Sequence, residues 1–214
     1  MKRFVFLVII LQVFASICVY GQSIAPVNPD FTNYLYAKSN NIINYQTEEG
    51  YFLGEIPSPV VLNFSNLGNN GSSPKFAQLY DLRAENGGSW LSPVRDQGLE
   101  GACWAFATYG AVESHWLKNG LAQADLSEQN LATCHGFDNT PSEGGHYYFS
   151  TAYLARRAGP IDESDDPYTL PSNPTCVSGY TPVAYVDQAR FLPGQSDSGY
   201  SNDLIKQSIL DYGA

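Results

Sequence analysis

The chain has 214 residues, a formal net charge of −10, and hydrophobic and aromatic contents of 43% and 14%. These values are typical of a folded domain and argue against an intrinsically disordered chain. The acidic balance argues against nucleic acid or an anionic membrane as a partner that binds through a basic surface.

Residues 1–21 have the pattern of a secretory signal peptide. Two basic residues precede an apolar run from Phe4 to about Ala15, and Gly21 fits a cleavage site. The apolar run is short for a membrane span. We therefore expect a cleaved signal and a mature chain that is secreted, periplasmic or at the cell surface, without membrane contact after cleavage. An uncleaved anchor or a lipid attached to Cys18 are the alternatives.

Export implies an oxidising compartment, in which disulfides persist. Of the four cysteines, Cys18 would leave with the signal, so Cys103, Cys134 and Cys176 remain. An odd number of cysteines in an exported protein indicates one free thiol.

Residues 22–77 show little regular pattern. Pro57 and Pro59 indicate an extended segment, and the Gly-, Asn- and Ser-rich stretch at 65–74 indicates a loop. The segment is short for an inhibitory helical pro-domain. We expect it to pack against the domain that follows, and a removable pro-region is the alternative.

Regular patterns begin after residue 78. Helical spacing of apolar residues predicts helices over 103–119, 144–160 and 201–213. Ser127 is a suitable N-cap for a further short helix. The alternation over 182–194 predicts a strand.

The stretch "RDQGLEGACWAF" places Cys103 at the first turn of a predicted helix. The partial positive charge of a helix N-terminus lowers the pKa of a thiol there, and the thiolate is a nucleophile. Attack on a carbonyl creates an oxyanion, for which the Cys103 N–H and the Gln97 amide are candidate donors. A buried structural cysteine beside a structural glutamine is the alternative.

The string "DQGLEGACWAF" resembles the active-site string of the papain-like cysteine proteases. Further motifs follow in family order: "YDLR", "SEQNL", a Gly-Gly pair and "DPY". The phrases "GEIPSPV" and "STAYLARRAGPIDESDDPY" resemble an exported bacterial and archaeal branch of this family. The resemblance implies an α+β papain-like fold, present mainly as the helical left lobe, with the β-rich right lobe largely absent from this chain.

This resemblance implies a role for each residue of the string. Cys103 would be the nucleophile, Gln97 the oxyanion-hole side chain, and Trp104 would pack beside the site. Gly144 and Gly145 would form a wall whose backbone pairs with an extended protein or peptide substrate. The family pattern also implies a disulfide between its two remaining cysteines, Cys134 and Cys176.

The chain departs from the family at a second bridge, which usually joins the positions of Glu100 and Ser142. Both cysteines are absent together, as the loss of a whole bridge requires. The Glu100 carboxylate lies three residues from the thiol in sequence. It either opposes formation of the thiolate or points to solvent.

The catalytic His of the family, oriented by an Asn, follows the Cys by about 130–150 residues, which lies beyond Ala214. His115 and His135 are poorly placed to reach the sulfur, and His146 is the one conceivable base. We therefore expect residues 78–214 to be a truncated N-terminal part of a peptidase domain.

Two other classes of function compete with a peptidase. One is a non-catalytic binding protein that retains the peptide groove. The other is a thiol redox protein, which the absence of a Cys-x-x-Cys motif disfavours. No residue cluster has metal-ligand spacing, so neither a metal nor an organic cofactor is implied, and nothing in the sequence indicates an oligomeric state.

The 214-residue chain is therefore predicted to show no appreciable hydrolysis of a fluorogenic peptide. General acid–base catalysis is worth about 10²–10⁴-fold, and the chain lacks a well-placed base. Restoring a downstream coding sequence should restore turnover, and Cys103→Ala should abolish it. Robust hydrolysis by the short chain, lost in His146→Ala, would contradict this and identify His146 as the base.

Overall fold

The computed structural model describes residues 25–43, 46–64, 76–85, 88–195, 197 and 199–214. The predicted signal peptide and the loop predicted at 65–74 lie outside the described residues.

The described chain is mainly helical, and it forms isolated β-bridges in place of a sheet. Its α-helices and two short 3₁₀-helices are α2 (Pro29–Ser39), η1 (Leu82–Ala84), α3 (Cys103–Lys118), α4 (Glu128–Cys134), η2 (Pro141–Glu143), α5 (Tyr147–Ala155) and α6 (Asn202–Tyr212).

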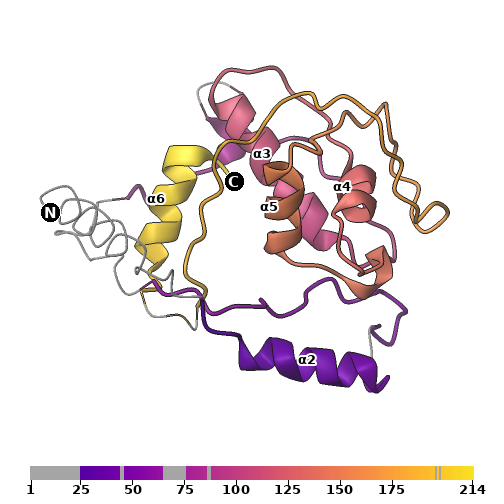
Figure 1. Ribbon diagram of the computed structural model, residues 1–214. Helices are drawn as coiled ribbons and strands as arrows, with labels where there is room; N and C mark the ends of the chain where they lie inside the picture. The colour runs from indigo at the N-terminus through magenta and orange to yellow at the C-terminus, as the bar shows by residue number, and fades with distance from the viewer. Residues whose placement is uncertain (1–24, 44–45, 65–75, 86–87, 196, 198) are drawn as a thin grey trace, which may run out of the picture.

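Helix α3 is the centre of the fold and contacts α4, α5 and α6 (Figure 1). Its residues Ala105 and Tyr109 are fully buried. Burial of apolar surface is the main favourable contribution to folding, so this helix anchors the elements around it. The core cluster contains Ile56, Ala102, Trp104, Ala105, Tyr109, Leu126, Leu131, Ala132, Phe149, Tyr153 and Leu154.

A buried ionic cluster joins α3 and α4 to the loop that precedes them. Arg95 contacts the carboxylates of Glu113 at 2.9 Å, Glu128 at 2.8 Å and Asp125 at 2.6 Å. The Glu113 and Glu128 side chains are 0% and 1% exposed. Burial of a carboxylate without a partner is costly, so both rely on Arg95 for a positive charge, and Glu113 Oε1 also accepts from Leu126 N–H at 3.0 Å.

The structure differs from the sequence-based expectations at two elements. Residues 182–194 run as an extended chain, and no strand forms there, because the described residues offer no ladder partner. Val183 N–H donates to Pro160 O at 2.9 Å, but no ladder continues from it.

Helix α2 was not predicted, although its start carries a recognisable signal. The Asn28 side chain accepts from Asp30 N–H at 3.0 Å, and proline occupies the first helical position. Asn at the N-cap followed by Pro is a common way to begin a helix. The helix has no buried residue, so the apolar periodicity on which the expectation relied is weak there.

Among the described residues, no helix combines the length and apolar character needed to cross a bilayer.

Replacing Arg95 should destabilise the protein severely. We expect Arg95→Ala to lower the free energy of unfolding in urea by about 3–5 kcal/mol, because it leaves buried carboxylates unpaired. Arg83→Ala is the matched control, since Arg83 pairs with Asp81 at the surface, where its side chain is 75% exposed. The control should leave the free energy of unfolding almost unchanged, because an exposed ion pair contributes little to stability. Equal effects of the two substitutions would contradict the structural importance of the buried cluster.

Candidate active site

Cys103 is the first residue of α3 and the free cysteine of the described chain. The N-cap, Ala102, makes no side-chain cap hydrogen bond, so the first N–H groups of the helix remain available. The N–H groups of Trp104 and Cys103 itself point at the sulfur and favour its thiolate. The residue is exposed, so a reagent in solution can reach it.

Gln97 lies in the loop that leads into α3, and both its side-chain amide and its backbone carbonyl form hydrogen bonds. Its side-chain Nε2 donates to Glu100 O at 2.7 Å, and its backbone O accepts from Tyr168 Oη at 2.9 Å. An amide nitrogen carries two N–H groups, so one donor remains for a further acceptor. Gln97 does not belong to the lining of the cavity that Cys103 borders.

Gly144 and Gly145 form a wall at which the backbone of another segment approaches closely. Gly144 has φ +79°, which L side chains rarely adopt, and a Cβ there would lie 2.7 Å from Gly54 O. A Cβ on Gly145 would overlap the ring of Trp104. Trp104 is 8% exposed and packs edge-on against Phe149 with 5.7 Å between ring centroids.

An N-terminal segment, Phe52–Ile56, occupies this wall. Gly145 N–H donates to Gly54 O at 2.8 Å, and Ile56 N–H donates to Gly145 O at 3.1 Å, which forms a parallel bridge. At its other end, Phe52 N–H donates to Leu99 O at 2.7 Å. The segment therefore pairs with the wall through its backbone, as an added strand does.

The same segment lies against the thiol. A Cβ on Gly54 would overlap Cys103 Sγ, so the backbone passes directly beside the sulfur. The sequence analysis did not single out Gly54. Its signal was an isolated glycine within an extended stretch, which often marks a close backbone approach.

This packing reverses the expected shift in the thiol pKa. Although the residue as a whole is exposed, partial burial of its sulfur raises the pKa of Cys103; the carboxylate of Glu55 adds to the rise, and the N–H groups at the start of α3 oppose it. The expectation of a lowered pKa was wrong because it considered the helix and left out the segment that packs on it.

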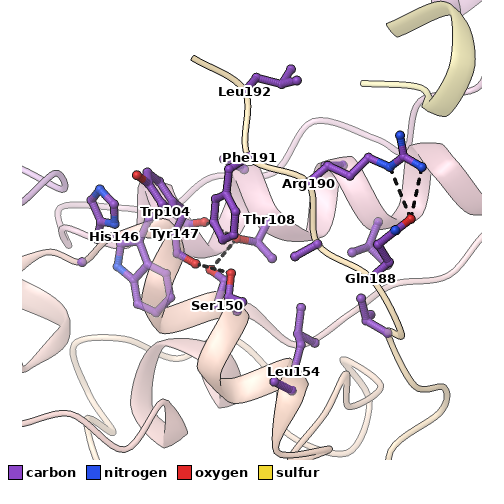
Figure 2. Close-up of a pocket in the computed structure, with 18 of the residues that line it drawn as sticks. Trp104, Thr108, His146, Tyr147, Ser150, Leu154, Gln188, Arg190, Phe191 and Leu192 are labelled. Carbon is purple, nitrogen blue, oxygen red and sulfur yellow. Dashed lines mark hydrogen bonds between the residues drawn. The ribbon is translucent and has the colours of Figure 1, made fainter. Parts of the chain in front are cut away.

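A cavity of about 1000 Å³ opens beside Cys103 between α3, α5 and the chain at 186–192. Figure 2 shows Phe191 projecting toward Tyr147 and Thr108 meeting Ser150 on its floor. The Phe191 and Tyr147 ring centroids are 5.2 Å apart, and the two hydroxyls are 2.6 Å apart. Cys103, Trp104 and Gly145 all border this cavity, whereas Gly144 does not.

The described part of the chain contains no hydrogen bond between a histidine and Cys103. His146 lines the cavity but is the N-cap of α5, where its Nδ1 accepts from Tyr148 N–H at 3.4 Å. Burial lowers the pKa of His146 to about 4. His135 is buried and stacks on Phe149 at 4.8 Å, and His115 contacts Tyr212 O at 2.9 Å near the far end of α3.

The disulfide expected between Cys134 and Cys176 is present, with Cα atoms 4.8 Å apart. Glu100 does not point to solvent, which was one of its two expected alternatives: it is 3% exposed, and its Oε2 accepts from Ser142 Oγ at 2.7 Å. The described residues include no group of three or more potential ligands that could hold a metal ion.

The sequence matches the family model described as papain family cysteine protease over residues 76–212. Cysteine proteinase 2 of Dictyostelium discoideum is 34% identical over 152 residues, which cover 69% of this chain and 36% of that protein. Digestive cysteine proteinase 1 of Homarus americanus is 40% identical over 122 residues, which cover 51% of this chain and 37% of that protein. The chain thus spans little more than a third of the length of these relatives.

Among solved structures, the digestive procathepsin L2 proteinase from Tenebrio molitor larval midgut matches with a TM-score of 0.53 and 23% identity. The match covers 73% of this chain and 55% of that one, and it supports the expected papain-like fold. The relatives named here are eukaryotic, so they do not support the exported bacterial and archaeal branch.

Gly54→Ala should displace the segment from the thiol, because the added Cβ overlaps Cys103 Sγ. Loss of the segment removes both burial and the Glu55 charge, which lowers the thiol pKa. The pH profile of alkylation by iodoacetamide should therefore move to lower pH, and the rate at neutral pH should rise. Gly88→Ala is the control, since a Cβ there meets nothing within 4 Å. An unchanged profile in Gly54→Ala would argue against this role of the segment.

Proposed function

Because the chain belongs to the papain family of cysteine proteases, we propose that it supplies the thiol-bearing part of a cysteine endopeptidase. The reaction is hydrolysis of peptide bonds through an acyl-enzyme on Cys103. The observation that carries the proposal is an exposed thiol at the uncapped start of α3, on the same cavity as Gly145.

In the proposed reaction, the Cys103 thiolate attacks the carbonyl carbon of an extended peptide, and the carbonyl oxygen becomes an oxyanion. The Cys103 N–H and the second N–H of the Gln97 amide would stabilise that charge. Collapse expels the amine and leaves a thioester, which water then hydrolyses. Gly144 and Gly145 would hold the substrate by backbone pairing, since the backbone of Phe52–Ile56 already pairs there.

Thiol activation and protonation of the leaving amine require a base and an acid. Both roles fall to the His of the papain pattern, which the Asn orients, and none of the three histidines of this chain is proposed to fill them. The chain is thus proposed to be the N-terminal, helical part of the peptidase domain over residues 78–214.

Residues 22–77 are proposed to act as a pro-region that blocks the substrate wall. The Gly54 carbonyl accepts from Gly145 N–H at 2.8 Å, so this segment takes up a backbone donor of the wall. A second anchor is the ion pair between Lys38 of α2 and Glu143, at 2.9 Å, next to the wall. The buried side chain of Ile56 joins the core.

Export after cleavage of residues 1–21 is proposed for the mature chain. The disulfide between Cys134 and Cys176 supports it, because disulfides persist in oxidising compartments. Protein or peptide is the proposed substrate. Assignment to the bacterial and archaeal branch stays a sequence-based prediction.

A non-catalytic peptide-binding protein is the competing function. It would retain the wall and the cavity without using the thiol. The two functions differ in whether Cys103 forms a covalent adduct that Gln97 stabilises, and this difference can be measured on the chain itself.

The test uses N-acetylglycinal, a small aldehyde that needs no pairing with the wall. Cys103 sulfur adds to the aldehyde carbon and the thiol proton passes to the oxygen, which forms a hemithioacetal within reach of the oxyanion donors. We expect Gln97→Ala to weaken the adduct by roughly tenfold, because the hydroxyl oxygen of the hemithioacetal loses one hydrogen-bond donor. Adduct formation would be followed by NMR of the ¹³C-labelled aldehyde carbon.

Alkylation by iodoacetamide is the matched control, because it displaces iodide and places no new oxygen on the carbon that sulfur attacks. Gln97→Ala should leave its rate unchanged, and Cys103→Ala should abolish both reactions. Equal affinity of wild type and Cys103→Ala for a short peptide, together with no hemithioacetal in wild type, would favour the binding protein.

A further inference from the structure

Glu100 is a buried carboxyl group with one side-chain partner. The residue is 3% exposed, and Ser142 Oγ donates to its Oε2 at 2.7 Å. Glu100 takes part in no salt bridge of the described chain. A polar group buried this deeply is costly unless it is hydrogen-bonded, so the Ser142 hydroxyl matters for its placement.

This hydrogen bond joins two walls of the candidate site. One is the loop from Gln97 to Gly101, and the other is the Gly144–Gly145 wall. The backbone carbonyl of Glu100 accepts from Gln97 Nε2 at 2.7 Å, so Glu100 sets where the Gln97 amide points. Ser142 lies in η2 and is separated from Gly144 by one residue.

The two walls also touch through their backbones. A Cβ on Gly101 would lie 3.1 Å from Gly144 Cα and 3.0 Å from Pro141 O. A close approach of this kind leaves no side chains between the walls to hold them together. The bond between Glu100 and Ser142 supplies a side-chain connection across this boundary.

We propose that Glu100 and Ser142 are positioning residues, whose hydrogen bond holds the Gln97 amide and the Gly144–Gly145 wall in register with Cys103. This inference rests on the proposed function for its catalytic meaning. The structural part of the inference is that one hydrogen bond fixes the position of the two walls relative to each other, and this part is independent of any reaction at the thiol.

The primary test measures hydrogen exchange by NMR in the full chain at two sites, the Gln97 side-chain amide and the Gly145 backbone amide. Ser142→Ala should accelerate exchange at both sites by roughly tenfold, as loss of the partner of a buried polar group predicts. Ser142→Thr retains the hydroxyl and Glu100→Gln retains an acceptor, so both should stay within about threefold of wild type. Glu100→Met removes the bond without leaving a buried carboxyl unpaired, and it covers the case in which Ser142→Ala does not fold.

Exchange at amides in the middle of α3 distinguishes positioning from general destabilisation. Selective acceleration at the two sites supports the proposal. Unchanged exchange at them, or equal acceleration throughout α3, overturns it.

The second readout is the affinity for N-acetylglycinal. We expect Ser142→Ala to weaken the adduct by about threefold, less than Gln97→Ala, with rescue by Ser142→Thr and no change in the rate of alkylation by iodoacetamide. An unaffected adduct, despite faster exchange at Gln97, overturns the positioning of an oxyanion donor. If wild type forms no adduct at all, the proposed function fails, and the exchange experiment still decides whether the bond orders the walls.

Discussion

Three stretches of backbone meet around the sulfur of Cys103, and they can do so only because each carries glycine at the meeting point. A Cβ on Gly101 would lie 2.9 Å from Leu53 O, and one on Gly144 would lie 2.7 Å from Gly54 O. Real Cβ atoms essentially never come so close to backbone, so side chains at these positions would force the segments apart. Close backbone packing therefore joins three segments: the start of α3, the substrate wall and the N-terminal segment. This packing depends on the absence of side chains at the glycines.

Backbone contact of this kind needs a rigid support, and the helical core supplies it. Helix α3 carries the thiol at its exposed end and buries Tyr109 further along. Arg95 fixes the approach to the helix by neutralising carboxylates that lie inside the protein. The site thus combines a helix start that adjoins the buried core with a wall that pairs through hydrogen bonds between backbone groups.

The helices that bury an apolar face were predictable from the sequence, because periodicity records burial. Helices α3, α5 and α6 fall within the expected ranges, and the short helix capped by Ser127 is α4. Helix α6 has no fully buried residue, but most of its side chains are half-buried, whereas most of the side chains of the unpredicted helix α2 are exposed. Residues 182–194 alternate like a strand, but a strand also needs a partner, which alternation cannot supply.

Some features of the candidate site were likewise predictable from the sequence, and others were not. Cys103 and Gln97 stand out in the sequence because their chemistry is carried by side chains in one short string. The pairing of Gly54 with Gly145 is made by backbone atoms far apart in sequence, and any residue type offers the same N–H and C=O groups. The raised thiol pKa follows from that pairing, so it could not be predicted from the helix alone.

The hydrogen bond between Glu100 and Ser142 has a consequence for working conditions. A nucleophilic cysteine functions only while its sulfur carries no disulfide or oxygen, so thiol reductants protect it. The same reductants attack disulfides by exchange, and the bridge between Cys134 and Cys176 is a possible target. A carboxyl–hydroxyl contact contains no sulfur and accepts no electrons. The loop that carries Gln97 therefore keeps this connection to the substrate wall under the reducing conditions that keep Cys103 a free thiol.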